Sequence, residues 1–492
     1  MREIVTLRTA VSSTLDVKRR LSGAARDYVL LTATTMGASF VVQVALARAL
    51  GPEGLGEYSA TSLFLIALTT AMLFGVPFAA SQRVARTTDT GDADEPNVTS
   101  AALGVALSAA VASAIVALAL WRPFAQFARL QEPAAGALLA AAAAVAVILH
   151  FTASLLIARL RLIQATALYV VQPIVVGAGL LLNGRVAMHG STLAALGFLG
   201  AGTAALGIVA AQRTPPSFHG AEVRLLLRRS VPASIVPYAA FLSAWIDRGV
   251  VVAIAGTVGL GWFTAASNVT ESLLRLPRGF GIFGVPAYAR LSDDPIGARR
   301  VLDSHVRIVA GLLLIPSAVL IASGSGLLTF LFRADFALAT TALRFLAIAI
   351  VPIAISLTLT GNLVGTERYS HAGRVMIVLV PIQASLAVAA TNVFSVAGTA
   401  MASALVWSIA VVLLAWDGVM AARTLAEIAA ASVVTWVLSW IVGSSLLDWP
   451  MSSAVSAVLS CLPISLFVIR SPELRLLRHM LPRTTRARAE GA

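Results

Sequence analysis

The sequence predicts an all-α polytopic membrane protein with about fourteen transmembrane helices. The chain of 492 residues is 58% hydrophobic and only 12% charged, with a mean hydropathy of +0.87. A soluble chain normally carries about twice that share of charged residues. Apolar runs of roughly 20 residues recur from end to end, and each could cross a bilayer as a helix. These runs are continuously apolar rather than alternating, which excludes barrel strands.

A Gly-rich segment occurs twice and indicates two related halves. Residues 51–60 read GPEGLGEYSA and residues 256–265 read GTVGLGWFTA, so the spacing is 205 residues. Six predicted spans separate the copies, an even number, so both copies face the same side of the membrane. The halves are therefore predicted to be parallel repeats related by an axis along the membrane normal.

Fourteen spans are expected along the chain. Every connecting loop has fewer than twenty residues, which leaves no room for a soluble catalytic domain. The expected spans are 28–50, 57–80, 100–121, 134–158, 166–183, 190–211, 230–254, 259–288, 304–323, 340–363, 373–392, 396–416, 426–446 and 450–469.

Basic residues set the expected orientation. With both termini in the cytoplasm, cytoplasmic segments hold 27 of the 36 Arg and Lys and outer segments hold six. Such a bias follows the positive-inside rule and requires an even number of spans. The net charge of +13 is thus attributed to topology and contact with anionic lipid, and no nucleic acid partner is expected.

The repeats define the expected domains. Residues 1–27 form a basic cytoplasmic segment, either an amphipathic helix on the membrane surface or a disordered tail. An N-terminal six-helix lobe is expected at 28–212, followed by a cytoplasmic inter-lobe linker at 213–229 and a C-terminal six-helix lobe at 230–417. Two extra transmembrane helices at 418–469 and a basic cytoplasmic tail at 470–492 complete the expected order.

Span 8 carries a polar stripe on one helical face. Thr264, Asn268, Glu271, Arg275 and Arg278 are spaced by three or four residues. Charges at membrane depth are costly and usually face an aqueous interior. Two guanidinium groups against one carboxylate leave positive charge, which suits the binding of a diphosphate. The alternative is that Glu271 and Arg275 neutralise each other and only stiffen the helix.

Span 7 carries adjacent charges, Asp247 and Arg248, which point to different neighbours because they are consecutive on a helix. Arg248 aligns with Gln43 of the first repeat. Two interpretations remain open, a gate between the halves and a purely structural helix–helix contact. Asp247 and Glu271 are also candidates for coupling to protons or sodium, or for fixed counter-ions.

The first half contributes other arginines. Arg48 precedes the first Gly-rich turn on the outer side and is a candidate substrate contact. At the inner mouth, Arg83, Arg86, Arg159 and Arg161 are expected to attract phosphate together, although topology alone explains each of them.

Both halves have an unusually long helix after the Gly-rich turn, and each contains Gly-Val-Pro, at residues 75–77 and 284–286. The second copy is about four residues longer, and the insertion falls near residues 276–279. We expect Pro277 to break or kink the helix there. A broken helix at membrane depth is tolerated where it lines a cavity.

The segment Leu46–Tyr58 resembles the opening signature of bacterial polysaccharide-biosynthesis flippases, the O-antigen and lipid-linked oligosaccharide translocases. They belong to the superfamily that includes lipid II flippases and multidrug exporters. Residues 247–248, 259–266, 276–277 and 286 are similar to the family's middle region, and 392 and 398–402 to its late motif. The second turn departs from Gly-Pro-Glu.

The resemblance implies two six-helix bundles facing each other in a V, plus two further helices. It also implies transport of an undecaprenyl-diphosphate-linked oligosaccharide from the inner to the outer leaflet of the bacterial cytoplasmic membrane by alternating access. Membrane lipids and polysaccharide polymerase or glycosyltransferase machinery are the expected further partners.

Other functions are weighed against this one. A drug or small-metabolite exporter of the same superfamily is the first alternative, and a polysaccharide polymerase or ligase the second, disfavoured by the short outer loops. The sequence has no phosphate-binding Gly-Lys-Ser/Thr loop, no Cys/His cluster with metal-ligand spacing and no recognisable Ser/His/Asp arrangement. We therefore expect no enzymatic activity, no cofactor and no metal.

Overall fold

The computed structural model describes residues 2–444 except 78, 82, 85–94, 132, 160, 184–187, 213–214, 219, 290–293, 367 and 417–418, together with 451, 454–456 and 458. Inside helices, side chains are described except in 2–33, 231–237, 278–287 and at single positions such as Arg275. The chain forms two compact units, Met1–Ala265 and Ala266–Ala492. The predicted six-helix lobes, with their linker at 213–229, stay a prediction.

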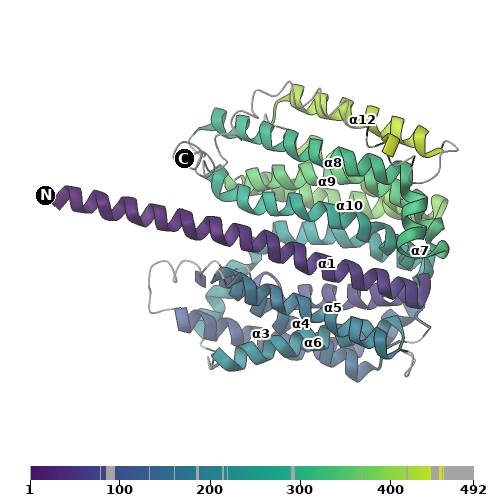
Figure 1. Ribbon diagram of the computed structural model, residues 1–492. Coiled ribbons are helices and arrows are strands. Elements are labelled where there is room, and N and C mark those ends of the chain that lie inside the picture. Colours follow the sequence, from purple (N-terminus) through teal and green to yellow (C-terminus); the bar gives the residue numbers. More distant parts are fainter. Residues whose placement is uncertain are drawn as a thin grey trace, which may run out of the picture. The chain divides into compact units, whose positions relative to one another are not determined.

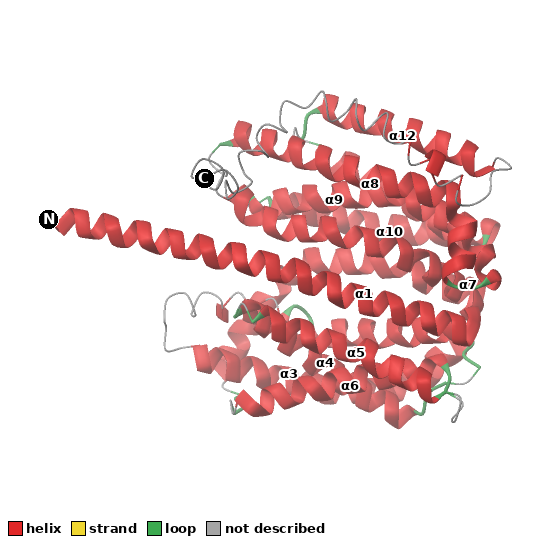
Figure 2. Cartoon of the chain, viewed as in Figure 1, coloured by secondary structure: helices red, strands yellow, loops and turns green. Residues whose placement is uncertain are grey.

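The described residues are helical and contain no strand (Figures 1 and 2), which confirms the predicted fold class. Ten helices within the described part of the chain are long and apolar enough to cross a membrane, so the number fourteen stays a prediction. The helices are α1 Arg2–Leu73, α3 Glu95–Phe127, α4 Gly136–Ala158, α5 Leu162–Leu182, α6 Gly190–Gln212, α7 Gly220–Ala289, α8 Pro295–Leu331, the 3₁₀ helix η1 Ala334–Ala339, α9 Thr340–Gly365, α10 Tyr369–Phe394, α11 Val396–Ala415 and α12 Ala422–Ser444.

Helices α1 and α7 each combine two expected spans. Each contains one residue with non-helical backbone angles, Gly51 in α1 and Gly256 in α7. The helix α1 begins at Arg2, so the backbone of the N-terminal segment is helical and continuous with the first span. Whether that segment lies on a membrane surface stays a prediction.

The long helix after the turn is broken in the first half rather than in the second. Phe74 and Gly75 have positive φ angles of 30° and 74°, and α1 ends just before them. In α7 the backbone stays helical through Pro277 to Ala289, so the helix is not broken there, and a kink at Pro277 stays a prediction. Pro77 follows the break within the first turn of the next helical segment, where a missing N–H costs nothing.

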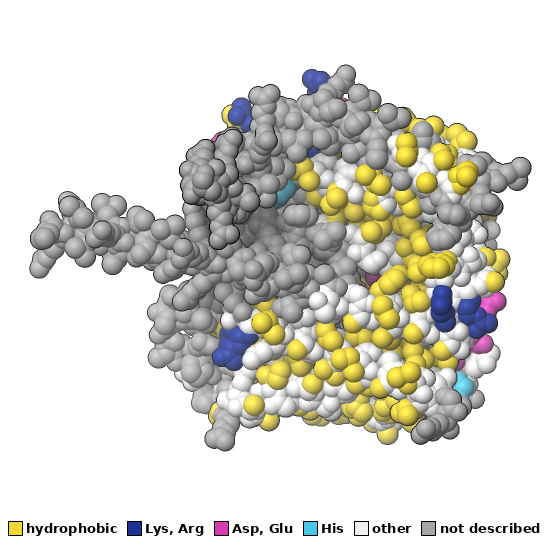
Figure 3. Space-filling model, in the orientation of Figure 1, with side chains coloured by type: hydrophobic (Ala, Val, Ile, Leu, Met, Phe, Trp, Pro, Cys, Tyr) yellow, Lys and Arg dark blue, Asp and Glu magenta, His cyan; other side chains and the backbone are white. Residues whose placement is uncertain are grey.

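The core of the first unit lies among α3, α4 and α6. It is built largely from alanine, which lets the helices approach closely. At Gly202 an added methyl group would overlap Val145. Figure 3 shows hydrophobic side chains over the middle of this group of helices, and Val111 and Ile115 of α3 are each 62% exposed. That surface suits contact with lipid tails.

In the second unit, α12 packs on α8. The Trp436 indole N–H donates to the Ser317 hydroxyl at 3.0 Å, and an added methyl group at Gly443 would touch Ala322 at 2.7 Å. Arg344 of α9 donates to the Ile321 and Gly443 carbonyls, both at 3.0 Å. One partly buried guanidinium thus ties three helices together.

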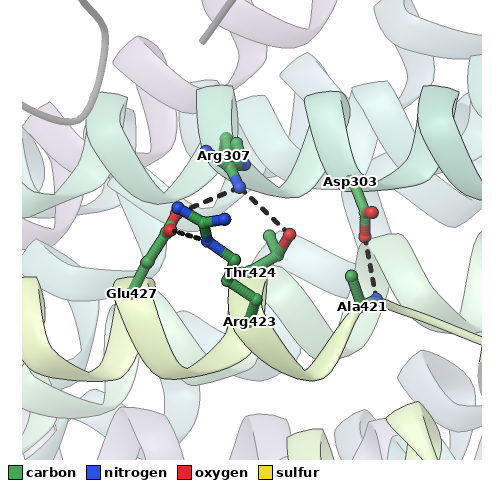
Figure 4. A network of polar contacts seen from close by, with 6 residues as sticks. All are labelled: Asp303, Arg307, Ala421, Arg423, Thr424 and Glu427. Carbon is green, nitrogen blue, oxygen red and sulfur yellow. Dashed lines mark hydrogen bonds and ion pairs between the residues drawn. The ribbon is translucent and has the colours of Figure 1, made fainter. Parts of the chain in front are cut away.

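A polar network joins the third and fourth turns of α8 to the start of α12. Arg307 of α8 lies 3.0 Å from a Glu427 carboxylate oxygen and donates to the Thr424 hydroxyl at 3.1 Å. Arg423 donates to the other Glu427 oxygen at 2.9 Å from within α12. Figure 4 shows these contacts beside the Asp303 carboxylate, which accepts from the Ala421 N–H. The network fixes the start of the first extra helix.

Candidate functional site

The two Gly-rich turns have the same backbone conformation. Gly51 has φ 71° and ψ −170°, and Gly256 has φ 69° and ψ −168°. This region of backbone space is open essentially to glycine alone. The glycines repeated at a spacing of 205 therefore encode the same bend in both halves.

The two turns also contact each other, and they do so reciprocally within the first unit. A Cβ on Gly56 would overlap the backbone carbonyl of Thr257, and a Cβ on Gly261 would overlap the carbonyl of Pro52. Gly56 and Gly261 are equivalent under the repeat, and so are Pro52 and Thr257. The contact is therefore pseudo-two-fold, as expected for parallel repeats that meet at their common axis.

A third segment packs against the first turn. Gly190, the first residue of α6, lies so close to the Gly54 carbonyl that a side chain would overlap it. Next to this point is a cavity of about 330 Å³, lined by Glu53, Glu57 and His189 among others. Glu57 is 3% exposed. Sequence analysis did not single out this carboxylate, because the second copy has Trp262 there and no carboxylate to match.

The charged pair of α7 lies in the interior of the first unit. Asp247 and Arg248 are 6% and 7% exposed. The Arg248 guanidinium lies over the Trp245 ring, 4.7 Å from its centroid. A desolvated cation over an indole is worth about 2 kcal/mol. Arg248 therefore stabilises α7 by packing on Trp245, one helical turn earlier. Its role in a gate stays a hypothesis.

The stripe of span 8 begins in the first unit and continues into the second. Thr264 is 5% exposed, while Asn268 and Glu271 are partly buried. The Asn268 amide nitrogen is buried without a hydrogen-bond partner among the described residues. The side chains of Arg275 and Arg278 lie outside the described residues, although their backbone is helical. The predicted anion site is thus untested by the structure.

The inner arginines have different surroundings. Arg83 forms an ion pair with Glu222 of α7. Arg159 donates to the Gln212 carboxamide oxygen at 3.2 Å and to the Thr99 hydroxyl at 3.1 Å. Both therefore join helices to one another.

The remaining first-half arginines are exposed or not described. Arg161 is exposed and lines a cavity, and Arg48 is exposed on α1 just before Gly51. Arg86 lies outside the described residues.

A tyrosine of α7 lies at the helix break of the first repeat. The Tyr238 hydroxyl donates to the Thr70 carbonyl, which is part of the last turn before the break. Its ring packs against Phe74, with 5.5 Å between centroids. The same carbonyl accepts from the Phe74 N–H at 3.2 Å, so Tyr238 adds a second hydrogen bond to the last turn before the break. The sequence gives no signal for this contact, because the two residues are far apart in the chain.

Known structures share this fold. The chain superposes on "Lipid II flippase MurJ" in an inward closed conformation with a TM-score of 0.71 and 14% identity, covering 90% of this chain and 97% of that one. The match to an inward-facing multidrug resistance MATE family transporter has a TM-score of 0.63 and 16% identity, and covers 82% of this chain and 98% of that one. The match to the Vibrio cholerae MATE transporter VcmN has a TM-score of 0.54 and 14% identity, and covers 83% of this chain and 99% of that one. The chain therefore has the fold that this lipid II flippase shares with these MATE transporters.

Sequence defines the family more narrowly. The profile of the family described as "Polysaccharide biosynthesis protein" matches residues 28–277, which is half of the chain. The chain belongs to this family, as its Gly-rich signature indicated. No protein with curated annotation matches it in sequence. The chain is thus a multi-pass membrane protein of the polysaccharide-biosynthesis family, with the fold of a lipid II flippase and of MATE transporters.

Proposed function

We propose that the protein is a flippase for a polyprenyl-diphosphate-linked oligosaccharide, a precursor of lipopolysaccharide or exopolysaccharide. It would move this glycolipid from the inner to the outer leaflet of the bacterial cytoplasmic membrane by alternating access. The glycan and its diphosphate would cross through a polar interior, while the polyprenyl chain stays in lipid. Polymerase and glycosyltransferase machinery would supply or consume the glycolipid.

The observation that carries the proposal is the reciprocal contact of the two Gly-rich turns. Alternating access requires two related halves that meet on one side of the substrate and can separate there. The backbones of the turns approach directly, with Gly56 against Thr257 and Gly261 against Pro52. Because neither glycine carries a side chain, the two turns can separate at these points without withdrawing a side chain of either glycine. We assign it to the outer gate, closed when the inner side is open.

The charged residues singled out in the sequence would contact the substrate or couple its transport to ions. Arg275 and Arg278, with Asn268 and Glu271, would hold the diphosphate, because planar guanidinium groups match phosphate oxygens. Arg48 and Arg248 would contact the substrate nearer the outer side. Asp247 or Glu271 would carry any proton or sodium coupling.

The test is a glycolipid translocation assay in cells that depend on this protein. Changing both Arg275 and Arg278 to Ala should abolish the appearance of the glycan in the outer leaflet at unchanged protein level. Arg122→Ala, an exposed arginine of α3, is the matched control and should translocate normally. Normal translocation by the Arg275/Arg278 double variant would refute the diphosphate site.

The second candidate function is export of a drug or small metabolite, which the shared fold of MATE transporters favours. The two functions separate in a deletion strain. Loss of surface polysaccharide with unchanged drug sensitivity supports the flippase. Drug sensitivity with polysaccharide retained supports the exporter.

A further inference from the structure

A hollow lies between α5 and α6 of the first unit, away from the Gly-rich turns. It is an open cavity of about 490 Å³, bounded by one face of each helix. Its lining from α5 includes Arg161, Gln164 and Val171, and its lining from α6 includes Ala204 and Gln212. None of these residues has a role in the transport proposal except Arg161, which was grouped with the inner mouth.

The cavity arises from the way the two helices pack. At Gly197 and Gly200 of α6 an added methyl group would lie 2.8 Å from Val176 and 2.6 Å from Val175, so α5 and α6 touch closely there. One turn further along, the cavity begins at Ala204. Small residues on α6 therefore permit close approach at one level and leave open space at the next.

The cavity is polar at one end only. Arg161 caps the start of α5, Gln164 lies in its first turn and Gln212 is the last residue of α6. The positive-inside bias predicts that this end is cytoplasmic. The rest of the wall is apolar, including Leu168, Val171 and Ile208. The Arg159 guanidinium donates to the Gln212 carboxamide oxygen at 3.2 Å, which orients that amide and adds a second cation behind it.

The surface around the cavity suits lipid. On α5, Ile163 and Ile174 are 65% and 62% exposed, so the outer face of this helix is apolar. A soluble anion would gain nothing from the apolar wall. A phospholipid would place its phosphate at Arg161 and one acyl chain along the wall.

We infer that this groove binds an anionic phospholipid of the cytoplasmic leaflet, with Arg161 as the headgroup anchor. The guanidinium donates to phosphate oxygens. The carboxamides of Gln164 and Gln212 line the same end of the cavity and contact the headgroup. The site holds a resident lipid and does not depend on which substrate the protein transports.

The experiment titrates the detergent-solubilised full-length protein with phosphatidylglycerol, and separately with phosphatidylcholine of the same chains, and counts bound lipid by native mass spectrometry. Arg161→Gln should weaken phosphatidylglycerol binding about tenfold, the loss of one charge-assisted contact. Arg122→Gln, exposed on α3, is the matched control and should bind like the parent. Ala204→Phe, which fills the apolar end, should also lose the lipid while keeping the charge.

Three results would overturn the inference. Equal losses in Arg161→Gln and Arg122→Gln would indicate general charge attraction. Full binding by Ala204→Phe would show that the groove is not used. Displacement of phosphatidylglycerol by millimolar inorganic phosphate or pyrophosphate would identify a soluble-anion site. Thermal unfolding of each variant, matched to the parent, separates lost binding from misfolding, and translocation is measured separately to keep this site distinct from the transport path.

Discussion

The two copies of the Gly-rich segment share one bend but differ in the helix that follows it. Gly51 and Gly256 agree within 2° in both backbone angles, although Pro52-Glu53 in the first copy is replaced by Thr257-Val258 in the second. After the bend, the first copy ends its helix at Leu73 and the second continues to Ala289. Glycines thus determine the bend locally, whereas the length of the next helix depends on its surroundings.

The Gly-Val-Pro motif makes this difference clear. It occurs in both copies, yet the chain turns at Gly75 and stays helical at Gly284. In the first copy Tyr238 donates to the Thr70 carbonyl and packs on Phe74. A tertiary contact from a distant segment therefore accompanies the break, and the motif alone does not determine it.

The largest effect is expected where the two copies touch. Gly56→Ala and Gly261→Ala each place a methyl group against a backbone carbonyl, which must move to make room. We expect each variant to lower glycolipid translocation about tenfold or more, because the closed outer gate loses population. Gly249→Ala, with nothing within 4 Å of the added carbon, is the matched control on α7.

Reciprocity sharpens this prediction. Both variants disturb one contact, so the double variant should lose much less than the product of the single losses. A large effect for one glycine and none for its equivalent would break the pseudo-two-fold account.

The next effect concerns the bends themselves. Gly51→Ala and Gly256→Ala force alanine into backbone angles that cost about 1–3 kcal/mol each. We expect similar downward shifts of the thermal unfolding midpoint in detergent for both. Gly37→Ala on α1, with free space and ordinary helical angles, should keep or slightly raise the midpoint, because alanine favours a helix. Unequal shifts at the two bends would show that the copies are not equivalent in energy.

A smaller effect is expected at the helix break. Tyr238→Phe removes the hydroxyl that donates to the Thr70 carbonyl and should cost about 0.5–1.5 kcal/mol. Hydrogen exchange should accelerate around residues 70–75. The equivalent stretch of the second copy, near residues 279–284, serves as the internal control. Acceleration in both stretches alike would mean that the tyrosine does not support the break specifically.

The smallest effect is expected in α12, which has no predicted counterpart in the first copy. The Arg307 side chain is 17% exposed and pairs with Glu427 from another helix, whereas Arg423 is 86% exposed. Arg307→Ala should cost about 1 kcal/mol and Arg423→Ala close to nothing. A double-mutant cycle with Glu427→Ala measures both couplings. Equal couplings would contradict the stronger role of the pair between helices.

Much of the fold could be predicted from sequence. Continuous apolar runs specify helices in a membrane regardless of tertiary detail, and the repeated glycines predicted equivalent bends at Gly51 and Gly256. The span count, the lobes and both anion-site arginines, Arg275 and Arg278, stay predictions. Their spacing predicts a shared helix face but not what that face meets.

Other features could not be predicted, because they depend on contacts between distant segments. The break at Gly75 involves Tyr238, more than 160 residues away. The helix continues through Pro277, where the sequence predicts a break or a kink. The lipid groove follows from Gly197 and Gly200 meeting valines of α5, which spacing within one helix does not reveal. The buried Glu57 could not be predicted from the repeat, because its equivalent in the second copy, Trp262, is uncharged.

The most direct test of the outer gate compares the reactivity of two adjacent positions. Thr257 is 5% exposed beneath the contact and Val258 is 37% exposed beside it. In a Cys461→Ser background, a membrane-impermeant thiol reagent should label Thr257→Cys about tenfold more slowly than Val258→Cys, and Gly261→Ala should remove that difference. Equal labelling of the two cysteines in the parent background, or no acceleration by Gly261→Ala, would contradict the gate.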